Sequence, residues 1–167
     1  MTGISRRTAA LGVASLGLAA GSTMCVAAAN GGPVRAPGVN VWHSGRDFVT
    51  TVERLLQDVK AKGIRLFDVI DQAKLAAEAG ITLRPSTLLV FGNPPLGIQF
   101  LTANPLAGLD WPVRLLVFEG EGAKVWIACT DFAWIAHRHG ITERDAAFAM
   151  ATKVVASIVA SVDASPA

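Results

Sequence analysis

Four polar side chains have the chemistry to bind a small ligand: Gln72, Asn93, Asn104 and Asp110. Amides donate and accept hydrogen bonds and a carboxylate accepts them, so such groups can orient a polar molecule in a pocket. Asn93 lies in the Gly- and Pro-rich stretch FGNPPLG, residues 91–97, directly after an apolar run. We therefore take these four side chains as candidate ligand-binding residues around that stretch.

The FGNPPLG stretch does not have the sequence of a phosphate-binding loop. Gly92 and Gly97 have the spacing of the two P-loop glycines, but Ile98 stands where that loop needs its lysine. No dinucleotide-binding glycine pattern is present in the stretch either. Phosphate binding by this loop is therefore not expected.

The prolines favour a structural role for the same stretch. Pro94 disfavours a helical backbone at Asn93, and Pro95 fits the first turn of a helix over 96–103. The Asn93 amide is expected to hold the turn by bonding to nearby backbone. We predict a strand-to-helix corner, with a ligand pocket above the strand end left open as a second interpretation.

Histidine and cysteine spacing gives no catalytic or metal-binding pattern. His137 and His139 would lie about 200° apart around a helix, and His43 is distant in the sequence. Cys129 lies in an alternating apolar strand, which is typical of a small core residue rather than a nucleophile. The nucleophile signature G-x-S-x-G is absent from the sequence. We predict no catalytic residue, no metal ligand and no cofactor.

Two aspartates and three tryptophans admit both a functional and a structural interpretation. Asp110 and Asp131 could act as paired carboxylates, but capping of a helix or turn accounts for both. Trp111, Trp126 and Trp134 could share an aromatic pocket, but packing in a core or interface is the favoured interpretation.

Hydrophobic periodicity and turn residues predict the secondary structure. Ser44 to Asp47 resembles a capping box before the first helix, and Asp71, Asp131 and Thr142-x-x-Asp145 are placed to open later helices. The expected strands are 39–43, 64–70, 86–91, 113–119 and 124–130, and the expected helices are 45–62, 72–79, 96–103, 132–139 and 143–162.

The last two strands form an antiparallel hairpin around 120–123. Strands outnumber the possible β-α-β units, which favours an α+β fold over a parallel α/β one. We predict a single α+β domain over residues 39–164. It has two layers, with about five mostly antiparallel strands covered on one face by helices.

The N-terminus resembles an export signal. Residues 1–29 contain a short basic start with Arg6 and Arg7, a mild apolar run over 8–20, and small residues before position 30. The run is too short to span a bilayer, which takes about 20 residues. The arginine pair favours twin-arginine export over the general secretory route, which stays open. Residues 30–38 are then a flexible linker, and the mature protein is periplasmic or secreted, without a membrane span.

Cleavage after residue 29 changes the charge and the thiol count. It removes two of the 15 basic residues, leaving as many basic as acidic ones, of which there are 13. No basic patch remains to favour nucleic acid. Of the two cysteines only Cys129 is left, so no intrachain disulfide is expected.

Several spaced motifs resemble the domain-of-unknown-function 302 family. They are Thr51-Val52 with Leu55, Lys62 to Ile64, Asp71 to Gly80, LLVFGNPPLG over 88–97, Pro105, LDWP over 109–112, LLVFE over 115–119 and KVWIACTD over 124–131. The resemblance implies a compact α+β domain, often a dimer, with no settled biochemical role. Gln72 replaces a histidine that is common in the family, which argues against a function that needs an imidazole there.

Together these observations predict an exported, non-catalytic module that works as a homodimer or binds a small ligand or partner. The alternative is a small enzyme, or a metal or cofactor carrier, that is exported folded. Its support is the arginine pair, because the twin-arginine route carries folded proteins.

Overall fold

A computed structural model describes residues 35–167, so the predicted signal peptide and the first part of the predicted linker lie outside the described residues. The elements are β1 (Val39–His43), α1 (Phe48–Ala61), β2 (Arg65–Asp71), α2 (Gln72–Glu78), β3 (Ser86–Gly92), α3 (Pro94–Ala103), the 3-10 helix η1 (Pro105–Leu109), β4 (Val113–Glu119), η2 (Glu121–Ala123), β5 (Val125–Thr130), α4 (Phe132–Arg138), α5 (Asp145–Val159), η3 (Ala160–Val162) and β6 (Ser165–Pro166).

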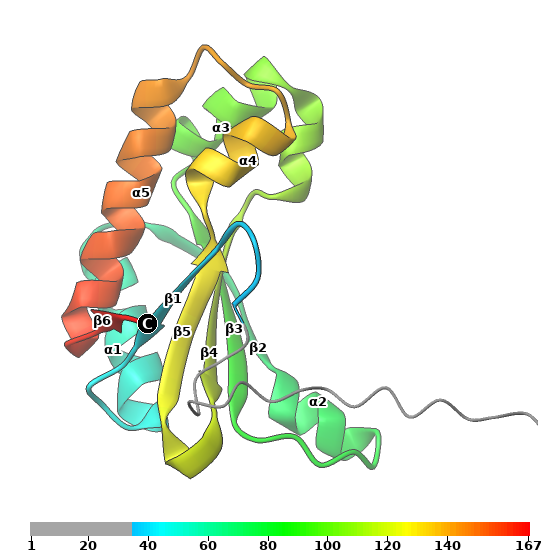
Figure 1. Cartoon of the computed structure of the whole chain (residues 1–167), viewed down its shortest axis with the longest axis vertical. Helices are drawn as coiled ribbons and strands as arrows, with labels where there is room; N and C mark the ends of the chain where they lie inside the picture. The colour runs from blue at the N-terminus through cyan, green and yellow to red at the C-terminus, as the bar shows by residue number, and fades with distance from the viewer. Residues whose placement is uncertain (1–34) are drawn as a thin grey trace, which may run out of the picture.

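The strands form one sheet in the order β2-β3-β4-β5-β1-β6, and every neighbouring pair is antiparallel (Figure 1). This confirms the predicted α+β class. The five predicted strands are all present, and β6 is an addition of two residues that pairs with Trp42 and His43. It extends the sheet beyond β1 at the C-terminal end of the chain.

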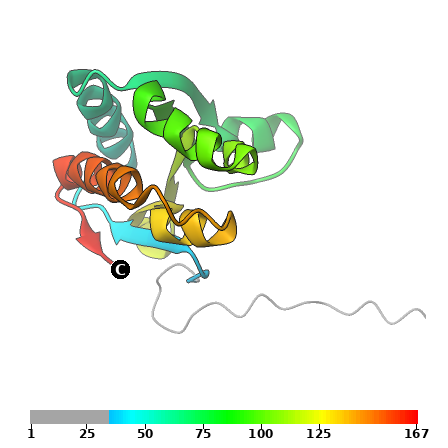
Figure 2. The ribbon, with the colours of Figure 1, turned by 90° about the horizontal axis from the view of Figure 1, so that it is seen from above.

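Helices α1 and α5 cover one face of the sheet, which confirms the two-layer arrangement (Figures 1 and 2). Helix α5 contacts α1, α3 and α4, so it is the centre of the helical layer. Alternate strand residues such as Leu89, Leu115 and Ile127 are fully buried beneath these helices. They form the core, whose burial supplies the main stabilising free energy.

The segment Asp145–Val162, which is α5 with η3, is long and apolar enough to cross a membrane by length and composition alone. Its inward residues are buried in the domain, among them Phe148, Val155 and Ile158. A core helix passes the same composition test, and packing against α1, α3 and α4 accounts for the apolar character of this one.

Aspartates cap three of the helices. The carboxylates of Asp71 and Asp131 accept hydrogen bonds from the backbone N–H groups of Lys74 and Trp134, as predicted. The cap of α1 was predicted wrongly, because Asp47 rather than Ser44 is its N-cap.

Ser44 is instead buried, with its hydroxyl 2.7 Å from the Thr51 hydroxyl. The capping-box prediction also fails at α5. There Arg144 is the N-cap and makes no side-chain cap bond, so Thr142 does not open the helix.

The FGNPPLG stretch is a strand-to-helix corner between β3 and α3, as predicted. Helix α3 begins at Pro94, one residue before the predicted first-turn proline, with Asn93 as its N-cap. The Asn93 side chain makes no cap bond, contrary to the prediction, and its backbone carbonyl accepts from Leu96 and Gly97 instead. The two prolines lack N–H groups, so fewer donors need a cap at this helix start.

Burial raises the pKa of the Cys129 thiol to about 12, with a smaller contribution from the Asp131 charge. The thiol therefore stays protonated near neutral pH. We expect a Cys25→Ser form of the full chain to resist an aromatic disulfide reagent at pH 8 until guanidinium unfolds it. Fast modification of the folded protein would contradict the core assignment of Cys129.

The raised pKa of Cys129 also makes the stability of the fold depend on pH. Because the folded state favours the protonated thiol, this thiol contributes to the free energy of unfolding below pH 9.0, and the contribution is lost as pH rises above that ordinary pKa.

Candidate functional site

The structure brings two of the four predicted ligand-binding residues together. Gln72 lies at the start of α2 and accepts a hydrogen bond of 2.7 Å from Ser86, the first residue of β3. Asn93 follows the other end of β3 and is exposed. Asn104 and Asp110 meet on opposite sides of one residue, His139. The four side chains therefore do not line one pocket.

Asp110 is the buried centre of a charged cluster. Its side chain is 3% exposed, and its Oδ2 lies 2.6 Å from Nε2 of His139, whose ring is 5% exposed. Arg138 Nη1 donates to both carboxylate oxygens, at 3.0 and 3.2 Å. Arg114 Nη2 donates to Oδ1 at 3.3 Å. We call Asp110, Arg114, Arg138 and His139 the Asp110 cluster.

Three chain segments position this cluster. Asp110 ends η1, Arg114 lies on β4, and Arg138 and His139 form the end of α4. Asn104 braces the arrangement, because its amide nitrogen donates to the His139 carbonyl at 2.8 Å while its oxygen caps η1. Both the nitrogen and the oxygen of the Asn104 side-chain amide are thus hydrogen-bonded to the protein backbone.

Asp110 is the C-cap residue of η1, but its carboxylate does not cap the backbone as predicted and is bound by three side chains instead. Sequence reasoning also missed Arg114, Arg138 and His139 as its partners. The spacing of four residues between Asp110 and Arg114 is a weak signal for a contact. No local pattern connects Asp110 with residues 28 and 29 positions later.

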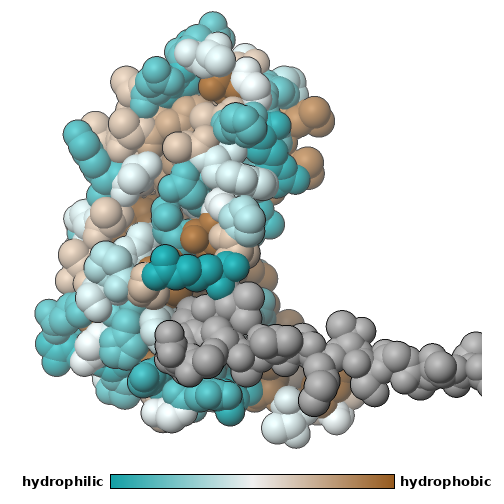
Figure 3. Space-filling view, viewed as in Figure 1, coloured by the Kyte–Doolittle hydropathy of each residue, from teal (hydrophilic) through white to brown (hydrophobic). Residues whose placement is uncertain are grey.

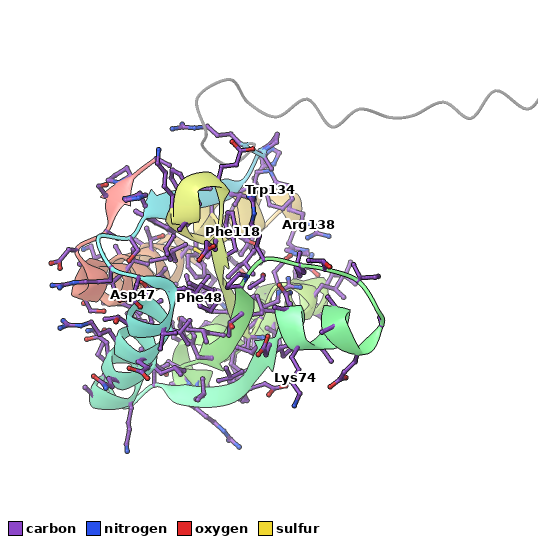
Figure 4. The ribbon with its side chains drawn as sticks, turned by 90° about the horizontal axis from the view of Figure 1, so that it is seen from below. Asp47, Phe48, Lys74, Phe118, Trp134 and Arg138 are labelled. Carbon is purple, nitrogen blue, oxygen red and sulfur yellow. The ribbon has the colours of Figure 1, made fainter. Side chains whose placement is uncertain are left out.

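Arg138 is fixed from a second direction by Trp134. Its guanidinium carbon lies 5.5 Å from the centre of the indole ring, within the range of a cation–π contact. Figure 4 shows the two side chains next to each other on α4. The guanidinium is therefore held between a buried carboxylate and an aromatic face.

A second feature of this region is an apolar crevice of about 30 Å³ at the FGNPPLG corner. Asn93 contributes the one polar side chain of its lining, which otherwise includes Leu96, Phe100, Trp111 and Val155. A water needs roughly 10–15 Å³ of such space, so the crevice has the size of about two waters. It is a packing gap beside Trp111 rather than a metabolite pocket.

The three tryptophans do not share a pocket. Trp111 packs on the glycines of the FGNPPLG corner and on Phe67, Trp126 packs on His43, and Trp134 packs on Arg138. The aromatic-pocket interpretation is therefore wrong, and each ring has a packing role.

Within residues 35–167 the structure has no group of three or more His, Cys, Asp or Glu side chains that could hold a metal ion. The two histidines of α4 have different surroundings. His137 is exposed, whereas the ring of His139 is buried against Asp110. The angular separation predicted for them on a helix is consistent with this difference.

The family model for the Domain of unknown function DUF302 matches residues 41–160. Because the match covers most of the chain, this protein belongs to the DUF302 family, as its motifs indicated. A crystal structure of an uncharacterized conserved DUF302 protein from Bacillus stearothermophilus is similar to it with a TM-score of 0.68 and 20% identity. The similarity covers 76% of this chain and 99% of that one, and at this identity it shows the fold alone.

Two curated relatives carry the name fluoride-specific ion channel FluC 1. The protein from Brucella suis biovar 1 is 37% identical over 98 residues, which is 59% of this chain and 39% of the relative. The protein from Brucella abortus biovar 1 has the same identity over the same length, which is 36% of that relative. The matched part of this chain thus spans less than two fifths of their length.

Proposed function

We propose that this DUF302 domain is a non-catalytic binding module that works as a homodimer, joined through the face of the sheet opposite α1 and α5. The observation that carries the proposal is an apolar row across five strands of that face. Strand register places its members side by side: Ile70, Leu88, Leu116, Ala128 and Val41. We call the face that contains this row, together with Val90 and Phe118, the open face.

The side chains of the open face are half-buried, and none of them belongs to the core cluster of the described residues or packs against it. In Figure 3 part of the surface on the right-hand side, the side on which α2 lies in Figure 1, is apolar. Large contiguous apolar patches are uncommon on soluble monomers and are typical of interfaces.

A second copy is the occupant that we propose for this surface. A two-fold axis lets one patch pair with itself, so a single apolar face is sufficient for both partners. The family resemblance also implies dimers. Two sheets packed face to face bury alternate residues of each strand, which is the pattern that the open face presents.

The curated relatives support a module that acts beside another protein rather than an enzyme. They are named as fluoride-specific ion channels and match this domain over a minor part of their length. We propose on this basis that the domain binds a small ligand or a partner.

We also propose that the protein is exported to the periplasm or outside the cell. The N-terminal sequence pattern supports this part of the proposal. Fractionation of cells expressing the tagged chain would overturn the export part if the protein stayed in the cytoplasm.

The interface can be tested with Phe118→Lys. Phe118 lies on the open face near the β4–β5 hairpin (Figure 4), and a lysine there places a charge in the proposed contact. We expect light scattering to show a dimer for the full chain and a monomer, or dimerisation weakened at least tenfold, for the variant. Met150→Lys, on the exposed side of α5, is the matched control and should leave the dimer intact. A monomeric parent protein at high micromolar concentration would contradict the proposal.

A further inference from the structure

We infer that the guanidinium groups of Arg114 and Arg138 form a binding site for a small oxyanion, a carboxylate or phosphate group. The inference gives a ligand class to the proposed binding role. All of the residues that form the site belong to one protomer, and Arg114 lies at the margin of the open face, opposite Val90 in the register of β3 and β4.

The first observation is an excess of positive charge. Arg114 and Arg138 both donate to the same oxygen, Oδ1 of Asp110, at 3.3 and 3.2 Å. Two positive charges thus share one carboxylate, and no other carboxylate within residues 35–167 forms an ion pair with either arginine. One positive charge is left uncompensated at this point of the surface.

The second observation is the supply of free donors. Each guanidinium has five N–H donors. Arg138 uses Nη1 for Asp110, and Arg114 uses Nη2 for Asp110 and the Leu109 carbonyl. The other nitrogens of both groups have no protein acceptor in the described part of the chain. The two side chains are 49% and 44% exposed, so a ligand in solution can reach them.

The third observation is that both groups are held in place before any ligand arrives. The Asp110 carboxylate is almost fully buried and bonds both arginines from the protein side, and Trp134 packs against Arg138. Side chains that are already ordered lose less conformational entropy when a ligand binds. A planar guanidinium edge matches the two oxygens of a carboxylate or phosphate.

A small hollow of about 10 Å³ adjoins Arg114. Asp110, Arg114 and Thr130 are among its lining residues. Its volume is that of about one water. The half-buried Thr130 hydroxyl is one further hydrogen-bonding group for a ligand oxygen or a water at this place.

The test is calorimetric titration of the full chain with sodium phosphate and with sodium acetate, at ionic strength held constant with chloride. We expect saturable binding of at least one oxyanion with a Kd in the millimolar range or tighter, and none for chloride. Arg114→Gln and Arg138→Gln should each weaken binding at least tenfold. Arg144→Gln is the matched control, because Arg144 is a partly exposed arginine outside the cluster, and it should leave the Kd unchanged.

A second variant tests whether the positive charge at position 138 is sufficient for binding or whether the planar guanidinium is needed, and a folding check accompanies every variant. Arg138→Lys keeps the charge but lacks the planar pair of donors, and circular dichroism checks that each variant is folded. We expect this variant to bind phosphate or acetate severalfold more weakly than the parent protein. In NMR spectra of the parent, the Nε–H signals of Arg114 and Arg138 should shift during the titration.

Three results would overturn the inference. They are no binding of either oxyanion at tens of millimolar, an equal loss of affinity in Arg144→Gln, and an Arg138→Lys variant that binds like the parent. The Phe118→Lys variant shows whether the oxyanion site and the dimer fail separately. Although its dimerisation is weakened, this variant should bind phosphate or acetate with the same affinity as the parent protein.

Discussion

Replacing Gly97 with alanine is expected to lower the free energy of unfolding by about 2–3 kcal/mol, the usual effect of inserting atoms into a well-packed site. In an ordinary helix interior the same change stabilises by roughly 0.5–1 kcal/mol. The sign reverses here because a Cβ at Gly97 would lie 1.8 Å from Nε1 of Trp111 and 2.2 Å from its Cε2. The indole ring would have to leave its place against α3.

The control for this prediction is Gly108→Ala in η1. A Cβ there would meet the side chain of Leu101 at 3.7 Å, an ordinary contact distance, and its backbone needs no positive φ. We expect a change within about 0.5 kcal/mol, as for surface substitutions without a special role. Urea denaturation followed by circular dichroism measures both variants.

A double variant identifies the cause. Trp111→Ala is itself destabilising, but it removes the ring that the new Cβ would strike. Adding Gly97→Ala to it should therefore cost far less than in the parent protein, because directly contacting residues are not additive. Equal cost in the two backgrounds would show that the glycine is needed for another reason.

This packing explains two glycines of the FGNPPLG stretch, which the sequence presents as a possible ligand cradle. Gly92 and Gly97 both lie against the Trp111 ring, which arrives from a segment 14 residues after Gly97. The glycine and proline spacing was sufficient to predict a corner. It could not show which side chain needs the space, because that contact depends on how the next segment folds back.

Local features were predicted well because their causes are local. Strand β1 has the predicted bounds, Val39–His43, since alternation is read within five residues. Asp131 caps α4 as predicted, because an N-cap needs only the next three residues. The capping box at Ser44 failed because its hydroxyl is engaged by the Thr51 hydroxyl and the Arg46 N–H, which the spacing of the box does not indicate.

Elements set by tertiary contacts could not be predicted. Strand β6 has two residues, too few for any periodicity, and exists because the chain end returns to Trp42 and His43. The Asp110 cluster joins η1, β4 and α4 in the same way. Its aspartate was selected as a candidate, and its arginines and histidine were not.

The Asp110 cluster gives the second large effect on stability. We expect Asp110→Asn to lower the free energy of unfolding by about 2–3 kcal/mol. The carboxylate is 3% exposed and accepts hydrogen bonds from Arg114 and Arg138, with His139 Nε2 also within bonding distance. An asparagine keeps the shape but provides one oxygen and no charge. The loss stays below that of a fully buried ion pair, because both arginines reach solvent.

Glu143→Gln is the control for this variant. Glu143 pairs with Arg144 at 3.9 Å with a side chain that is 65% exposed, so its loss should change stability by less than about 0.5 kcal/mol. Urea denaturation of both variants at one ionic strength makes the comparison. A loss for Asp110→Asn as small as that of the control would mean that the cluster does not hold η1 and α4 together. It would also remove the preorganisation from which the oxyanion site is inferred.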